Sequence, residues 1–97
     1  MRVKILASAS QDLIDGYHFY ERQAEGLGDR YLDSLFKDID ALKAGAGIHP
    51  KFFEYYHRLL AHTFPFAIYY LVEADSVLVY AVLDCRRDPS WTREKLQ

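Results

Sequence analysis

Apolar residues recur at every second position at the start of the chain and at every third or fourth position soon after it. Residues 2–7 read RVKILA, with Val3 and Ile5 on one face, and this alternation predicts a half-buried strand. The helical stripe that follows predicts a first amphipathic helix and comprises Leu13, Tyr17, Tyr20, Ala24 and Leu27. Ser8 and Gln11 have the spacing of a capping box, so we expect them to begin this helix.

A second helical stripe follows a short break that contains Gly26 and Gly28. Its members are Tyr31, Leu32, Leu35, Phe36, Ile39 and Leu42. Glycine accepts the left-handed backbone found at helix ends, so we expect Gly26 and Gly28 to end the first helix and Gly45 and Gly47 to end the second. Because only a few residues join the two helices, they should pack as an antiparallel hairpin.

The second half of the chain is rich in Val, Ile, Tyr and Phe and predicts three strands, namely the run from Arg58 to Thr63 and segments near 65–72 and 77–83. The polar break from Glu73 to Ser76 makes a hairpin of the last two. The simplest arrangement is a three-stranded antiparallel meander with the first strand at its edge. We therefore expect an α+β fold with the order β-α-α-β-β-β, the helical hairpin on one face of the antiparallel sheet, and one domain over residues 1–97.

Composition is that of an ordinary globular protein, and the formal net charge of -2 disfavours non-specific binding to nucleic acid. The single cysteine, Cys85, cannot form an intrachain disulfide and is compatible with a reducing compartment. The first ten residues carry too short an apolar run for a signal peptide, and no segment approaches the roughly 18 apolar residues that span a bilayer. We expect a soluble cytoplasmic protein that has no contact with membranes.

Two arginines directly follow the last predicted strand. Arg86 and Arg87 precede Asp88-Pro89, where proline ends the strand because it lacks an amide donor. If the meander forms, Arg58 reaches the same rim of the sheet, and further cations lie nearby at Arg93, Lys95 and Lys51. Since the arginine fork matches phosphate and carboxylate, we predict that this rim binds an anion or an acidic partner. The alternative is that one arginine of the doublet pairs with Asp84, Asp88 or Glu94 and only fixes the tail.

Short motifs stand in a specific order and spacing between Arg58 and Trp91. They are Arg58-Leu59-Leu60, the segment FPFAIYY at 64–70, the segment VYAVL at 79–83, the segment RRDP at 86–89, and Trp91 itself. This set resembles the RelE/ParE family of toxins from type II toxin–antitoxin modules, often described as plasmid-stabilisation proteins. The family commonly has a histidine where this chain has Asp84.

The resemblance implies a growth-inhibiting toxin that a cognate antitoxin protein keeps silent. The residues that would meet the target, or be covered by the antitoxin, are Arg58, Arg86, Arg87, Trp91 and Arg93. ParE-like members bind DNA gyrase and stall it with cleaved DNA, without chemistry of their own, whereas RelE-like members cut mRNA on the ribosome. A member that has lost its toxicity is a third reading, prompted by Asp84. A homodimer and a hetero-oligomer with the antitoxin both remain open.

A metal-free ribonuclease needs a general base, a cation for the phosphate and an acid for the leaving oxygen. The candidates for the base are His57, His62, Asp84, Tyr55 and Tyr56, and none has a sequence neighbour that would tune it. The RelE-like enzymes tend to be strongly basic around the second strand, but this chain has only Lys51 and Arg58 there, with Glu54 of opposite sign. We therefore favour the ParE-like, non-enzymatic reading.

Metal and cofactor motifs are missing from the sequence. His18, His49, His57 and His62 lack the paired spacing of a zinc site, and Cys85 does not complete one. The chain has no glycine-rich phosphate loop, no Gly-x-Ser-x-Gly elbow and no His-Glu-x-x-His helix. We expect neither a metal nor a cofactor, and we expect Cys85 to be inert although neighbouring cations favour a thiolate.

Overall fold

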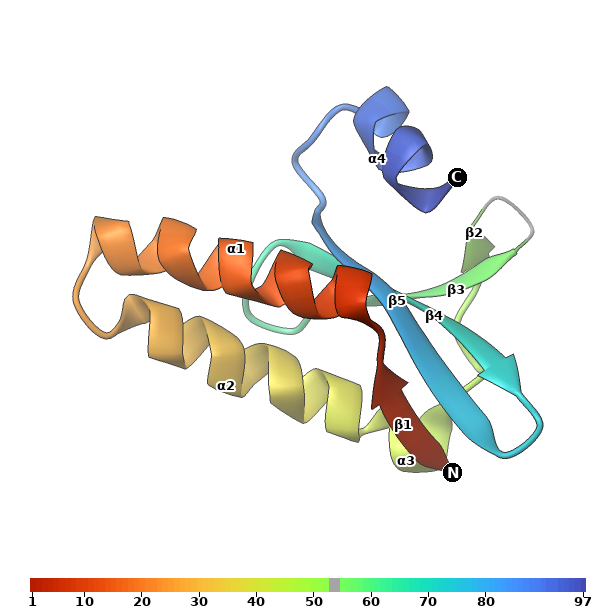
Figure 1. Ribbon diagram of the computed structural model, residues 1–97. Coiled ribbons are helices and arrows are strands. Elements are labelled where there is room, and N and C mark those ends of the chain that lie inside the picture. Colours follow the sequence, from red (N-terminus) through yellow and green to blue (C-terminus); the bar gives the residue numbers. More distant parts are fainter. Residues whose placement is uncertain (53–54) are drawn as a thin grey trace.

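The computed structural model describes residues 1–52 and 55–97, so Phe53 and Glu54, including the charge counted at Glu54, lie outside the described residues. Within these described residues, nine elements follow one another (Figure 1). They are β1 (Arg2–Ile5), α1 (Ala7–Gln23), α2 (Leu27–Asp40), α3 (Leu42–Gly45), β2 (Lys51–Phe52), β3 (Tyr56–Leu60), β4 (Phe66–Glu73), β5 (Ser76–Asp84) and α4 (Pro89–Leu96). The expected α+β class is confirmed.

The five strands form one mixed sheet in the order β1-β5-β4-β3-β2. Strands β3, β4 and β5 make the expected antiparallel meander, and β1 joins its edge by pairing in parallel with β5. The two-residue strand β2 pairs with β3 and was not predicted. The prediction of a strand over 58–63 was wrong in its bounds, because the strand begins at Tyr56 and the chain turns before Pro65.

Helices α1 and α2 form the predicted antiparallel hairpin on one face of the sheet (Figure 1). Gly26 lies between them with a φ of 84°, the left-handed conformation expected at this joint. The predicted capping box was wrong, since α1 begins directly after β1. Leu6 occupies the N-cap position, and the Ser8 hydroxyl instead donates to the carbonyl oxygen of Tyr80 on β5 at 2.6 Å.

The sheet is covered on both faces. On the hairpin face, a buried cluster centres on the helical stripes and the inward residues of β4 and β5, among them Tyr31, Leu35, Ile68, Tyr70 and Val79. On the other face, α4 packs Leu96 and Trp91 against Tyr56, Tyr69 and Leu83. The molecule therefore has three layers, namely the hairpin, the sheet and α4 (Figure 1).

An irregularity between Tyr69 and Tyr70 changes which β5 residues face the hairpin. Before it, Val77 and Val79 point to the hairpin, and after it Ala81 and Leu83 point to α4 while Val82 points to the hairpin. A β-bulge inserts one unpaired residue and so reverses the two-residue alternation. This reversal gives the end of β5 an apolar surface on which α4 can dock.

Candidate target-binding surface

The loop after β5 sends its two arginines to different partners. Arg86 pairs with Asp84, with Nε donating to Oδ1 at 3.0 Å and Nη2 donating to Oδ2 at 2.9 Å. Hydrogen bonding from Arg86 holds the pKa of the Asp84 carboxyl below its ordinary value of 3.8. The pairing with Asp84 that the sequence offered as an alternative is therefore present at Arg86.

Arg87 has an aromatic partner. Its guanidinium carbon lies 4.5 Å from the ring centroid of Trp91, and the amine of Lys95 lies 5.7 Å from the same ring. Trp91 and Lys95 stand one helical turn apart on α4, and Arg87 comes directly before the N-cap of this helix. That N-cap is Asp88, which accepts from the Ser90 amide at 2.8 Å, and Pro89 occupies the first helical position. We call Arg87, Trp91 and Lys95 the cation–tryptophan cluster.

The cation–tryptophan cluster forms one wall of a cleft between α1 and the end of β5. The cleft has a volume of about 400 Å³, and α1 contributes Asp12, Asp15 and Phe19 to the facing wall. Desolvation raises the pKa of Asp12, although its carboxylate accepts from the Val82 amide at 3.0 Å. The cleft thus sets cations on an aromatic ring opposite carboxylates, a mixed surface suited to a protein partner.

Arg58 lies on β3, opposite Tyr69 on β4, and its guanidinium carbon stands 4.9 Å from the ring centroid of Phe52. Burial raises the pKa of Tyr69, and a hydrogen bond with Arg58 opposes that rise. Desolvation likewise raises the pKa of Cys85 while Arg58 opposes the rise, so the sequence-based argument for a thiolate was wrong in direction. Arg58 belongs to the α4 face of the sheet.

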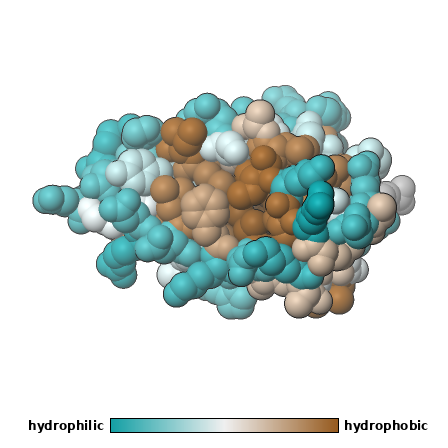
Figure 2. Space-filling view, turned by 60° about the horizontal axis from the view of Figure 1, so that its bottom comes forward, coloured by the Kyte–Doolittle hydropathy of each residue, from teal (hydrophilic) through white to brown (hydrophobic). Residues whose placement is uncertain are grey.

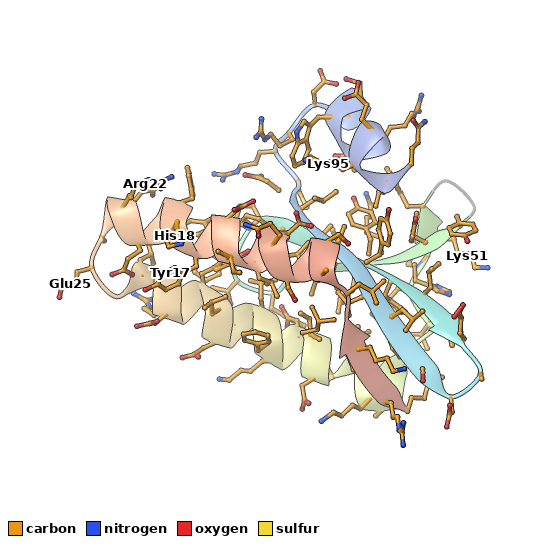
Figure 3. All side chains as sticks on the ribbon, viewed as in Figure 1. Tyr17, His18, Arg22, Glu25, Lys51 and Lys95 are labelled. Carbon is orange, nitrogen blue, oxygen red and sulfur yellow. The ribbon has the colours of Figure 1, made fainter. Side chains whose placement is uncertain are left out.

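Arg93 lies on α4 beside a second cleft, of about 510 Å³, together with Tyr55, Tyr56 and Leu96. Desolvation raises the pKa of Tyr56 to about 12, with Tyr80 adding to the rise. Lys51 lies on β2, at the opposite edge of the sheet from β1 (Figure 3). The structure thus unites Arg87 with Trp91, sets Arg58 and Arg93 on the same side of the sheet, and turns Arg86 toward Asp84.

Of the histidines, His18 lies on α1, His57 lies on β3, and His49 and His62 lie in loops. His57 stacks on Tyr70 with ring centroids 5.1 Å apart, and His49 Nδ1 lies 2.5 Å from the Tyr70 hydroxyl. His62 contacts the buried carboxylate of Asp38, 2.7 Å from Nδ1 to Oδ1. Over residues 1–52 and 55–97, no group of three or more His, Cys, Asp or Glu side chains could hold a metal ion.

Sequence reasoning missed α4 and the acidic wall that α1 contributes to the cleft. The signal for α4 was present in Asp88-Pro89-Ser90, which is a helix N-cap followed by proline at the first helical position. Had this been used, the spacing of Trp91 and Lys95 would have predicted that these two side chains share one face of a helix. No helix in the part of the chain that the structure describes is long and apolar enough to cross a membrane.

The chain is thus a three-layered α+β domain that carries cations and aromatic rings on α4 and on the sheet face beneath it. The family model described as ParE toxin of type II toxin-antitoxin system, parDE matches residues 3–89, so the chain belongs to the ParE toxin family. A chain in the solved structure of the chromosomal ParDE TA system from P. aeruginosa is similar in fold, with a TM-score of 0.64 and 16% identity over 84% of this chain and 92% of that one. The search of curated proteins gave no match.

Proposed function

We propose that this protein is a toxin that arrests bacterial growth by binding DNA gyrase and that a cognate antitoxin neutralises it. Its membership of the ParE toxin family carries the proposal. The fold it shares with a chain of the ParDE TA system supports the existence of an antitoxin partner. The action requires no chemistry by the toxin itself, only a surface that holds its target in one state.

The surface that we assign to the target comprises the cation–tryptophan cluster and Arg58. Tryptophan and arginine are the residue types most enriched among interface residues that dominate binding energy. The Arg87 guanidinium lies over the Trp91 ring, and this contact orders the guanidinium before any partner arrives and so reduces the entropy lost on binding. Arg86 has a smaller part in this proposal, because Asp84 already occupies its fork.

The positions of the candidate cation and the candidate bases give less support to a ribonuclease activity. Arg58 contacts Phe52 and Tyr69 on the α4 face, whereas His57, its neighbour in sequence, stacks on Tyr70 on the hairpin face. A cation that holds a phosphate and a base that takes the 2′-hydroxyl proton must lie on the same side of the scissile bond's pocket. Asp84, another of the candidate bases, is held by Arg86.

The test is induced expression of the chain in a bacterial host, with growth, an SOS reporter and mRNA 5′ ends followed together. We expect growth arrest with SOS induction and intact mRNA, and purified protein should increase gyrase-dependent cleavage of plasmid DNA. New mRNA ends that require translating ribosomes would replace the proposal with the ribonuclease. Absence of arrest at a verified protein level would indicate a member without toxicity.

A pair of arginine substitutions tests whether the cation–tryptophan cluster is the surface that contacts gyrase. Arg87→Ala should weaken gyrase-dependent cleavage about tenfold or more, the size of effect expected of an interface arginine. Arg22→Ala is the matched control, because Arg22 is also an exposed arginine but lies near the end of α1, away from Lys95 (Figure 3). Equal loss of activity in both variants would refute the assignment of the cation–tryptophan cluster as the contact.

A further inference from the structure

The segment of residues 46–50, which joins α3 to β2, is held on the sheet at its middle by polar contacts. Figure 2 shows an apolar patch, bordered by hydrophilic residues, on the face that lies below in Figure 1, where α3 leads into this segment. Ala46 packs against the core on the hairpin face, whereas Ile48 is 79% exposed. Gly47 and His49, on either side of Ile48, both contact the hydroxyl of Tyr70 on β4.

The Tyr70 hydroxyl fixes the protonation state of His49. Tyr70 has 0% relative exposure, and its oxygen accepts from the Gly47 amide at 3.0 Å. Burial raises the pKa of Tyr70, and hydrogen bonds from the backbone of Gly47 and His49 oppose that rise. A hydroxyl has two acceptor lone pairs and one hydrogen, so the two amides occupy the lone pairs and the hydrogen is donated to His49 Nδ1, 2.5 Å away. His49 is therefore neutral and carries its own hydrogen on Nε2.

His57 contacts the same segment with the opposite tautomer. Its Nδ1 lies 2.8 Å from the carbonyl oxygen of His49, which can only accept, so Nδ1 of His57 carries a hydrogen. A second proton on His57, at Nε2, leaves this hydrogen bond in place. A proton on His49 Nδ1 instead points at a hydroxyl whose lone pairs are occupied, and the Tyr70 hydroxyl loses its acceptor. The two neighbouring histidines thus respond differently to acid.

The surroundings of His49 do not offset a positive charge on its ring. The charged and titratable groups around it are Tyr70 on β4, His57 and Arg58 on β3, His62 in the loop after β3, and Asp38 on α2. Asp38 is the carboxylate of this set, and His62 occupies both of its oxygens, with its amide at 3.0 Å and its Nδ1 at 2.7 Å. Desolvation and the nearby His57 lower the pKa of His49 below its ordinary value of 6.5. The stability that neutral His49 contributes is therefore fully present above pH 6.5 and is lost as the pH falls through 6.5 toward the folded pKa.

We propose that His49 and Tyr70 form a proton-sensitive clasp, which ties residues 47–50 to the sheet and opens when His49 Nδ1 takes up a proton. This segment continues directly into β2, and the Arg58 amide on β3 donates to the carbonyl oxygen of Pro50 at 2.9 Å. Opening of the clasp therefore loosens the attachment of β2 to β3.

The link to β2 connects the clasp with the target-binding surface. The Phe52 ring of β2 lies 4.9 Å from the guanidinium carbon of Arg58, so release of β2 removes the ring that supports this cation. Arg58 belongs to the surface that we assign to the target. The step from the clasp to a pH-dependent target surface rests on the proposed function, whereas the clasp itself does not.

Nuclear magnetic resonance of the full chain tests the clasp without any partner. At about pH 7.5, long-range proton–nitrogen spectra should show the Nε2–H tautomer for His49 and the Nδ1–H tautomer for His57. The protection of the Gly47 amide against hydrogen exchange should fall by up to about tenfold per pH unit below pH 6.5, until the folded pKa is reached, because opening takes up one proton. A hydrogen on His49 Nδ1 at about pH 7.5, or Gly47 protection that does not change with pH, would overturn the proposal.

A neutral replacement of His49 identifies the group that takes up the proton. His49→Gln does not titrate, so the protection of Gly47 should lose its dependence on pH. His18→Gln is the matched control and should retain the full dependence, because His18 lies on α1, far from Lys51 of β2 (Figure 3). A dependence on pH that persists in His49→Gln would assign the proton to another group and refute the clasp.

The Arg58 amide reports whether the opening reaches β2. Because it donates to Pro50, its protection should fall in acid in parallel with that of Gly47. If Gly47 opens while Arg58 remains protected, the opening stops before β2 and the proposed effect on the target surface is refuted. These measurements contain no gyrase, so their failure would leave the proposed function standing, and a lack of gyrase-dependent cleavage would leave the clasp standing.

Discussion

Two buried tyrosines should respond in opposite directions to the same chemical change. Tyr31 and Tyr70 both have 0% relative exposure. The Tyr31 hydroxyl has no hydrogen-bond partner among the described residues, and burial raises the pKa of Tyr31. The Tyr70 hydroxyl accepts from the Gly47 amide at 3.0 Å and lies 2.5 Å from His49 Nδ1. Phenylalanine retains each ring and removes only the oxygen.

The magnitude follows from what each hydroxyl loses on folding. A buried polar group without a partner costs about 1–3 kcal/mol, so Tyr31→Phe should raise the free energy of unfolding by about 1 kcal/mol. For a domain of 97 residues this corresponds to an increase in Tm of about 4–8 °C. Tyr70→Phe removes two hydrogen bonds and leaves the Gly47 amide unpaired, so it should lower the free energy of unfolding by about 1–2 kcal/mol.

Gly16 provides a double-mutant cycle for the same hydroxyl. A Cβ at Gly16 would lie 2.2 Å from Tyr31 Oη and 2.5 Å from Cζ. Alanine gains about 1 kcal/mol in helix propensity, but overpacking costs about 1–3 kcal/mol, so Gly16→Ala should be destabilising on balance. In the Tyr31→Phe background the nearest atom is gone while the ring remains, so about 0.5–1 kcal/mol should return as coupling.

Urea unfolding at 25 °C, followed by far-UV circular dichroism, measures all four variants, with an unchanged m value as the sign that the denatured state is unaffected. The decisive result is the sign of the change in the free energy of unfolding caused by Tyr31→Phe. A loss of about 1 kcal/mol, similar to that of Tyr70→Phe, would mean that the Tyr31 hydroxyl has a hydrogen-bond partner such as an ordered water. The interpretation of the Tyr31 hydroxyl as a buried group without a hydrogen-bond partner would then fail.

Three further predictions concern pH and the docking of α4. Because the pKa of Asp84 is lowered by Arg86, Asp84→Asn should cost about 1 kcal/mol at pH 7, and this difference should disappear in urea titrations as the pH falls below 3.8 through the folded pKa. Because desolvation raises the pKa of Asp12, its ionised form is disfavoured in the folded state, so Asp12→Asn should stabilise the protein at pH 7 and have no effect well below pH 3.8. Leu96→Ala removes a buried contact of α4 and should release the helix at a local cost of about 2 kcal/mol. The fluorescence emission of Trp91, the only tryptophan, should then shift to the red, while the midpoint of global urea unfolding stays almost unchanged. A concerted shift of both signals would show that α4 unfolds only with the whole domain.

Hydrophobic periodicity predicted the elements that bury one continuous face. Tyr31, Leu35 and Ile39 are all buried against the sheet, as their helical spacing required. Phe36 is the exception, because it follows Leu35 by 100° around the helix and lies at the margin of the stripe, where only a neighbouring element could cover it. Whether a marginal position is covered depends on tertiary packing, which periodicity does not contain.

The sequence predicted which residues form the candidate site, but it did not predict the contacts between them. Asp84 stands two positions before Arg86, so their pairing is local and was foreseen as an alternative. The stacking of Arg87 on Trp91 required the helix α4, whose weak apolar face shows little periodicity over eight residues. The bulge at Tyr69 and Tyr70, which turns Leu83 toward α4, leaves no mark in the residue pattern, since the strand is apolar on both faces.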